Sequence, residues 1–132
     1  MKLLDTTFLV DHQRGDEDVA EFLERQEDSN ENLVTSSINL KEIAVGKMMV
    51  EEPMPSFDDV LSDFGWMTVE PFDETQALEA ARIEAELRDS GDYEPDLSAD
   101  ILIAGVACDI DAPVVTRNVS DFEKVGVDVE TY

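Results

Sequence analysis

Oxygen-bearing side chains occur at four places where the sequence changes between apolar and polar residues. Asp5 follows the run KLL, Glu42 lies within SSINLKEIAVG, and Asp100 lies within LSADILIAG. The fourth segment, TRNVSDF, follows two valines and contains three further candidates, which are Thr116, Asn118 and Asp121. Carboxylate and amide oxygens are the ligands that Mg²⁺ and Mn²⁺ prefer. These residue types therefore favour a site for a hard divalent cation.

Several carboxylates that converge on one crevice raise one another's pKa unless a cation lies between them. A bound Mg²⁺ or Mn²⁺ removes this conflict, turns water into a nucleophile and stabilises the leaving oxygen of a phosphodiester. Such hydrolysis needs neither cysteine nor histidine, and the chain has one of each, Cys108 and His12. We expect Cys108 to be a small core residue and His12 to lie on a helix surface or to have a packing role.

The acidity of the chain weakens any argument from carboxylate spacing alone. Asp and Glu account for 33 of the 132 residues, so acidic patterns arise by chance. Each candidate also has an ordinary explanation. Asp5 could cap a helix, Asp100 could be a first-turn acid favoured by the helix dipole, and Glu42 could simply face solvent. These alternatives remain open from the residues themselves.

The net charge of -24 arises from 33 acidic and only nine basic residues, spread over the whole length. So acidic a surface repels itself in dilute salt, whereas in molar salt the Debye length falls to about 3 Å and the repulsion is screened. With 42% apolar residues the chain can still bury a core. We interpret the composition as that of a protein from an extreme halophile.

Short apolar strands separated by helices are predicted along the chain. The expected strands are 2–5, 33–37, 67–72, 113–116 and 127–132. Helices are expected at 6–15, 16–28, 37–49, 57–66, 73–91, 96–111 and 118–125. Ser37 or Asn39 could cap the third helix, Asp73 or Thr75 could cap the fifth, and Gly91 could end the fifth.

This order of elements predicts an α/β fold with a parallel sheet covered on both faces. In such sheets, ligands bind beyond the carboxyl ends of the strands, where the strand order switches. Asp5 stands at one of these ends. The length suits a single domain over residues 1–132. No leader-like start and no apolar run of about 18 residues is present, so we expect a cytoplasmic protein without membrane attachment.

The four segments together resemble the PIN-domain ribonucleases, in particular the VapC-like toxins of toxin–antitoxin pairs. The segments LLDTTFLVD, SSINLKEIAVG, LSADILIAG and VVTRNVSDF match the motifs of that family, and they extend over nearly the whole chain. The resemblance implies a three-layer α/β/α sandwich with a central parallel sheet of about five strands. It also implies an Mg²⁺- or Mn²⁺-dependent ribonuclease that hydrolyses RNA with a water nucleophile. The implied partners are a cognate antitoxin and a second copy of the chain, as a homodimer.

Carried over to this sequence, the resemblance implies that Asp5, Glu42 and Asp100 are metal ligands. Asn118 takes the place of a fourth acid, and Asp121 could substitute for it or act through water. Three threonines would support these groups, namely Thr6, Thr7 and Thr116. Thr7 stands where the family usually has Asn or Ser, and Asn118 removes a charge at the site.

Two other readings compete with the ribonuclease. A degenerate domain that binds antitoxin or nucleic acid without turnover is one, and Asn118 favours it. A receiver or phosphatase-type α/β domain is the other, but a phosphatase needs a second acid where Thr7 stands, and the segment LVTSS lacks the acid that a receiver requires. Few basic residues could contact RNA phosphates or an antitoxin tail; the candidates are Arg14, Lys41, Lys47, Arg82, Arg88 and Arg117.

Overall fold

Five short strands form a single parallel sheet at the centre of the molecule, in the order β3-β2-β1-β4-β5. The computed structural model describes the whole chain, Met1–Tyr132. The strands are β1 (Lys2–Leu4), β2 (Leu33–Ser36), β3 (Thr68–Glu70), β4 (Val114–Val115) and β5 (Val129–Glu130). Each lies within its predicted range. The chain adds β2 and β3 on one side of β1 and then β4 on the other, so the strand order switches between β1 and β4.

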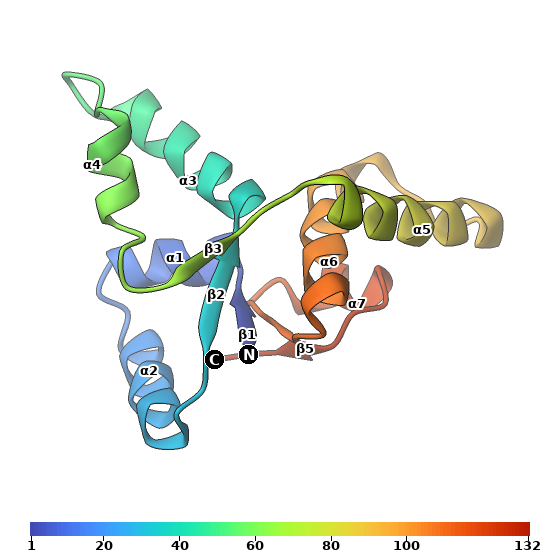
Figure 1. Cartoon of the computed structure of the whole chain (residues 1–132), viewed down its shortest axis with the longest axis horizontal. Helices are drawn as coiled ribbons and strands as arrows, with labels where there is room; N and C mark the ends of the chain where they lie inside the picture. The colour runs from blue at the N-terminus through green and yellow to red at the C-terminus, as the bar shows by residue number, and fades with distance from the viewer.

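Helices cover both faces of this sheet, which confirms the predicted α/β/α sandwich (Figure 1). One face carries α1 (Thr6–Gln13), α2 (Glu17–Ser29), α3 (Ser37–Val50) and α4 (Phe57–Ser62). The other carries α5 (Glu74–Ser90), α6 (Ser98–Ile110) and α7 (Val119–Lys124), with the short 3₁₀ turn η1 (Pro95–Leu97) before α6. None of these helices combines the length and the apolar character that a transmembrane segment requires.

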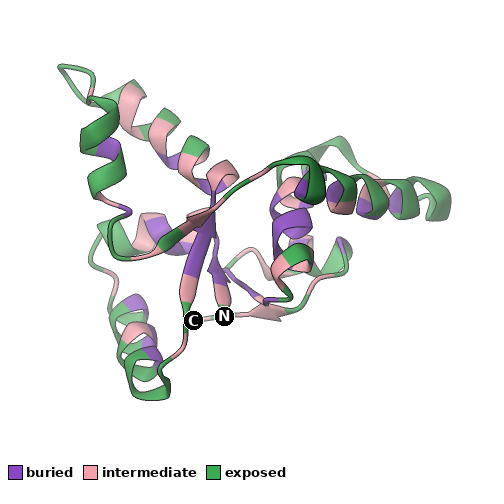
Figure 2. Ribbon diagram, viewed as in Figure 1, coloured by how far each residue is buried: buried purple, intermediate pink, exposed green.

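Neighbouring strand residues point to opposite faces of the sheet and so build two separate cores. Leu3 and Val114 pack into the core under α5, α6 and α7, whereas Leu4 and Val115 pack into the core under α1 to α4. Figure 2 shows that the buried residues are concentrated in the sheet and on the helix sides that face it. The outer helix surfaces are exposed and carry most of the acidic residues.

Helix ends largely follow the predicted capping residues, with one correction at α3. Asp73 caps α5 by accepting from the backbone N–H of Thr75, and Gly91 ends it in the left-handed conformation, with φ of 82°. The cap of α3 is Ser36, neither of the two residues that the sequence suggested. Its hydroxyl accepts from the Asn39 backbone N–H, and Asn39 lies inside the first turn. Because the strand ends one residue earlier than predicted, the cap moves with it.

Cys108 is half-buried and packs against the core under α5, α6 and α7, so it is less enclosed than the small core residue that the sequence predicted. It lies at the edge of α6, where its Sγ is 3.9 Å from Nη2 of the exposed Arg82 on α5. Burial raises the pKa of the Cys108 thiol, which therefore stays protonated and unreactive at neutral pH.

Helices α5 and α6 pack closely at Gly105, where a side chain has no room. A Cβ built on Gly105 would lie 2.8 Å from the carbonyl oxygen of Gln76 and 2.9 Å from the backbone nitrogen of Ala80. We expect Gly105→Ala to lower the free energy of unfolding by about 1–3 kcal/mol, because the two helix backbones must separate. Urea denaturation in high salt measures this change.

Gly46 provides a matched control in the middle of α3, since nothing lies within 4 Å of a Cβ built there. Gly46→Ala is expected to raise the free energy of unfolding by about 0.5–1 kcal/mol, because alanine favours the helix. Equal effects of the two substitutions would contradict the packing argument.

Candidate functional site

The predicted site residues gather at the carboxyl ends of β1 and β4, where the strand order switches. Asp5 directly follows β1, and Thr116 directly follows β4. Both are buried, with exposed fractions of 4% and 0%. This is the place in a parallel α/β sheet where crevices and ligands are expected.

The carboxylate of Asp5 accepts hydrogen bonds from three different segments. Thr116 donates from Oγ1 to Asp5 Oδ2 over 2.7 Å, and Asn39 donates from Nδ2 to Oδ1 over 3.2 Å. Thr7 Oγ1 lies 3.3 Å from the same Oδ2 and 3.1 Å from Thr116 Oγ1. Although Asp5 occupies the N-cap position of α1, its side chain makes no capping hydrogen bond. The helix-cap alternative for Asp5 is therefore wrong, since the side chain faces the crevice.

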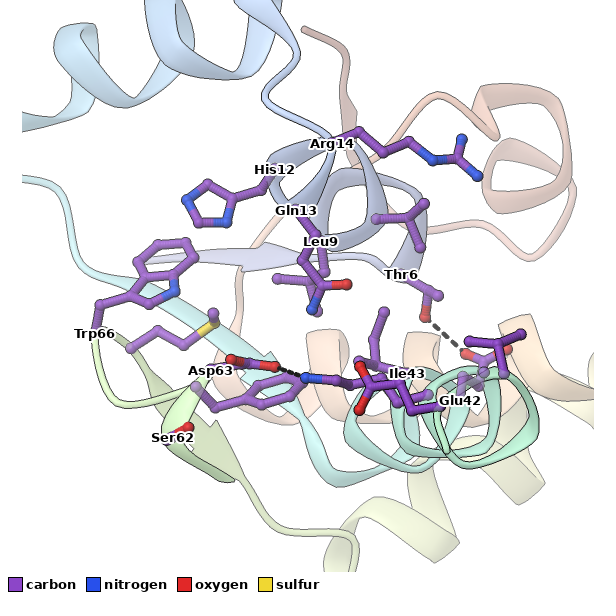
Figure 3. A pocket seen from close by; sticks show the side chains of 17 residues that line it. Thr6, Leu9, His12, Gln13, Arg14, Glu42, Ile43, Ser62, Asp63 and Trp66 are labelled. Carbon is purple, nitrogen blue, oxygen red and sulfur yellow. Dashed lines mark hydrogen bonds and ion pairs between the residues drawn. The ribbon is translucent and has the colours of Figure 1, made fainter. Parts of the chain in front are cut away.

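Glu42 is connected to the same network, so it does not simply face solvent. Thr6 donates from Oγ1 to Glu42 Oε1 over 2.9 Å (Figure 3). Asn39 donates to Thr6 Oγ1 over 3.0 Å as well as to Asp5. Thr6 and Thr7 thus hydrogen-bond to Glu42 and Asp5, respectively.

Asn39 is a site residue that the sequence analysis missed, because it was considered only as a helix cap. Its side chain is completely buried and bridges Asp5 and the Thr6–Glu42 pair. One signal was available: Asn39 and Glu42 are three residues apart on α3 and so share a helix face.

Asp100 lies in the first turn of α6, where the charges of the other acids affect the pKa of its carboxyl. Partial burial, and after it the charges of Asp5, Asp121 and Glu42, together raise the pKa of its carboxyl to about 6. A helix dipole would favour the ionised form and lower the pKa. Asp100 does lie in the first turn, as that explanation requires, but burial and like charges outweigh any effect of the dipole on its pKa.

Asn118 and Asp121 occupy the start of α7, beside Thr116. Asn118 donates its backbone N–H to Thr116 Oγ1 over 2.9 Å and holds the N-cap position without a side-chain cap. Asp121 lies in the first turn of α7 and pairs with Lys124 at 4.0 Å. Asp121 does not occupy the N-cap position of α7, which is held by Asn118.

Most of the basic residues are engaged away from this site. Arg117 extends to Asp11, Asp16 and Asp18 and lies over the Tyr132 ring at 4.6 Å. Lys47 pairs with Asp63, and Arg82 and Arg88 pair with glutamates of their own helix. Of the six candidates, only Arg14 and Lys41 form no ion pair.

The donor set fits a hard divalent cation. Four carboxylates and one amide gather at this crevice, and of these acids only Asp121 has a basic partner, Lys124 at 4.0 Å. Burial and the charges of the other three acids raise the pKa of Asp100. No three Asp, Glu, His or Cys side chains lie closely enough to enclose a metal ion by themselves. Small side-chain movements and water ligands would be needed, which is common for Mg²⁺ because it retains several waters.

A pocket of about 840 Å³ opens beside the acidic residues, between α1, α3 and the segment that precedes β3. Thr6 and Glu42 form one end of it, and His12 and Trp66 form the other (Figure 3). Arg14 and Lys47 also line the pocket. His12 is exposed on α1, in agreement with the sequence analysis.

Asp100→Asn is expected to stabilise the metal-free protein at neutral pH. The folded-state pKa of about 6 exceeds the ordinary 3.8, so ionisation of Asp100 costs the folded state stability. This cost grows as the pH rises from about 4 to about 6 and is constant above. The increase in melting temperature should therefore be present at pH 7–8 and disappear near pH 4, measured by thermal unfolding in chelator and high salt.

Asp96→Asn is the matched control, because it removes the same charge from an exposed position in η1. Its melting temperature shows how much stability is gained when any one negative charge is removed from so acidic a chain. If both variants shifted the melting temperature equally at every pH, the burial argument for Asp100 would be wrong.

Comparison with known proteins agrees with this geometry. The family model described as PIN domain matches residues 2–128. DNA-bound VapBC from Salmonella typhimurium includes a chain that is 26% identical, with a TM-score of 0.81 and coverage of 99% of this chain and 98% of that one. VapBC2 from Rickettsia felis, bound to a promoter DNA fragment, gives 20% identity and a TM-score of 0.81 over 99% and 98% of the chains.

A third similar structure is FitAcB from Neisseria gonorrhoeae, with 24% identity and a TM-score of 0.76 over 98% of this chain and 96% of that one. A search among curated protein sequences gave no significant match.

Proposed function

The chain belongs to the PIN domain family, and from this premise we propose that it is a metal-dependent endoribonuclease and the toxin of a toxin–antitoxin pair. PIN domains are generally nucleases that use divalent metal ions. The observation that carries the proposal is the convergence of Asp5, Glu42 and Asp100 at the strand-order switch, with the pKa of Asp100 raised to about 6.

In this proposal Asp5, Glu42 and Asp100 hold Mg²⁺ or Mn²⁺, with Asp121 as a further ligand. The bound ion would supply a water nucleophile and would stabilise the leaving oxygen. Thr116 and Asn39 fix the direction of the Asp5 carboxylate, and Thr6 fixes that of Glu42. Asn118 lies at the same crevice and offers a neutral amide where a fourth acid would add charge.

The similar structures are VapBC and FitAcB complexes, which support an antitoxin as a partner. We propose that a cognate antitoxin covers the crevice, that the toxin forms a homodimer, and that residues 1–132 act as one nuclease domain. RNA is the proposed substrate.

Cleavage of a labelled single-stranded RNA in about 2 M KCl tests the catalytic proposal. Products should appear with Mg²⁺ or Mn²⁺ and not in excess chelator, and they should map to internal positions of the RNA. Full cleavage in excess chelator would refute the metal mechanism.

A second candidate is a PIN domain that binds RNA or antitoxin without turnover. It is favoured by Asn118, which removes one charge from the site, and by the absence of a ready-made group of three metal-binding side chains. Binding of Mn²⁺ and RNA with no products at any salt concentration would select this candidate.

A further inference from the structure

The pocket beside the acidic crevice continues well beyond the residues that would hold a metal. It runs from Thr6 and Glu42 past Leu9 and Gln13 to His12 and Trp66 at its far end (Figure 3). The floor between the two ends is partly apolar, with Leu9, Ile43 and Phe64 among its lining residues. A strand of nucleic acid with its phosphate at the acidic end would therefore place a neighbouring nucleotide in this pocket.

The far end of the pocket presents two aromatic rings to solvent. The centroids of His12 and Trp66 are 4.9 Å apart, with an angle of 35° between the ring planes. Trp66 is 41% exposed, and His12 is exposed as well. These are the single tryptophan and the single histidine of the chain. A ring pair that is left this open contributes little to the core, but its exposed ring faces offer a place for a nucleobase to stack.

Charge alone gives this pocket little affinity for a polyanion. Lys47 is neutralised by Asp63, which leaves Arg14 as the one lining cation without an ion pair. The side chain of Arg14 extends toward the Thr6 end of the pocket (Figure 3). High salt would further reduce the gain from counterion release. Base stacking on aromatic rings depends much less on salt, so it can supply affinity where phosphate contacts do not.

We propose that Trp66 and His12 form a stacking subsite for one unpaired base of the RNA, next to the scissile phosphate, and that Arg14 contacts a phosphate between the two. This subsite rests on the proposed ribonuclease function. It selects single-stranded RNA, because bases in a duplex are already stacked on their neighbours. Trp66 is thus a positioning residue that acts on substrate binding, and the reacting atoms lie at the other end of the pocket.

A set of RNA oligonucleotides, each with one abasic nucleotide, tests the subsite directly. At one fixed distance from the cleaved bond, the abasic nucleotide should raise KM by about tenfold, within the range expected for loss of one stacked base. Trp66→Leu should raise KM for intact RNA by a similar factor, with kcat changed much less. When the Trp66→Leu variant cleaves the oligonucleotide that is abasic at that position, its KM should rise no further, because both changes remove the same contact.

Two variants serve as matched controls. Trp66→Phe keeps a ring and should recover most of the affinity. Phe57→Leu replaces an aromatic side chain that is 77% exposed on α4 and does not line this pocket, so its KM should equal that of the wild type. The proposal would be overturned if Trp66→Leu raised KM by the same factor for every oligonucleotide, whichever nucleotide is abasic. An unchanged KM would also overturn it, and is the result expected if a protein segment occupies the pocket in place of RNA.

The fluorescence of Trp66 separates failure of the subsite from failure of the proposed function. As the chain has no other tryptophan, quenching by an RNA oligonucleotide reports on the surroundings of Trp66 alone. If the quenching is lost with only one of the abasic oligonucleotides, the subsite is supported, even in a protein that does not cleave RNA. Cleavage by the wild type without any such quenching would overturn the subsite and leave the ribonuclease standing.

Discussion

Replacement of Asp5 by asparagine is expected to lower RNA cleavage by about 10²–10³-fold, the size of effect seen when one charged or polar contact to a transition state is lost. Asp5 is the most buried of the acids at the site and the one that receives hydrogen bonds from Thr116, Asn39 and Thr7. Its carboxylate is therefore held in place before a metal arrives. An amide at this position removes the negative charge that would bind the cation.

The fold should tolerate Asp5→Asn, because the amide has the same shape and the Thr116 hydroxyl can rotate to accept a hydrogen bond as well as to donate one. Cleavage of labelled RNA, Mn²⁺ affinity and melting temperature should be measured together. Cleavage and Mn²⁺ affinity should fall while the melting temperature stays within a few degrees.

Glu21→Gln is the control for the loss of one negative charge, since Glu21 is exposed on α2, away from the crevice. It should retain wild-type cleavage. If Asp5→Asn cleaved RNA as fast as this control, Asp5 would not be a metal ligand. If neither the wild type nor Asp5→Asn cleaved RNA and both bound it equally well, the candidate that binds without turnover would be correct.

Transfer from about 2 M KCl to 0.1 M KCl is expected to lower the melting temperature by about 10 °C or more, equivalent to about 3 kcal/mol for a domain of this size. The nine basic residues cannot neutralise 33 acids, and six of them already hold ion pairs. The remaining acids repel one another, and this repulsion is screened only when high salt makes the Debye length short.

The salt effect should be specific to charge screening. Sucrose at high concentration favours compact states without screening charge, so it should not fully replace KCl. Neutralising exposed acids on α2, as in the quadruple substitution Glu21→Gln, Glu24→Gln, Glu27→Gln and Asp28→Asn, should make the melting temperature less dependent on salt. A wild-type protein that is equally stable at both salt concentrations would refute the halophilic interpretation.

Much of the fold could be predicted because its signals are local. Short apolar strands, helices with a 3.6-residue pattern and stop signals such as Gly91 each depend on a few neighbouring residues. The alternation of strands and helices then allowed a parallel, covered sheet to be inferred before any contact was known. The error in the capping residues was also local: the cap of α3 is Ser36, one residue before the nearer predicted position.

The candidate site residues could be named from the sequence, but their arrangement could not. The apolar context of Asp5, Glu42 and Asp100 singled out these acids among 33. No pattern near Asp5, however, indicates that its carboxylate is held by Thr116, which is 111 residues away, or by Asn39, which is 34 residues away. Asn39 looked like a possible helix cap because its contacts with Asp5 and Thr6, which belong to another part of the chain, cannot be seen in the residues around it.

The sequence by itself therefore determined the order of the elements, the acidic surface and the candidate ligands, all of which follow from residue type and short-range pattern. Only the tertiary structure decided that Asp5 faces a crevice and does not cap a helix, that the other acids raise the pKa of Asp100, and that Trp66 lies across a pocket from Glu42. The physical reason is that hydrogen bonds, burial and charge repulsion act over a few ångströms in space. Residues far apart in the chain meet at that distance only after the strands have assembled.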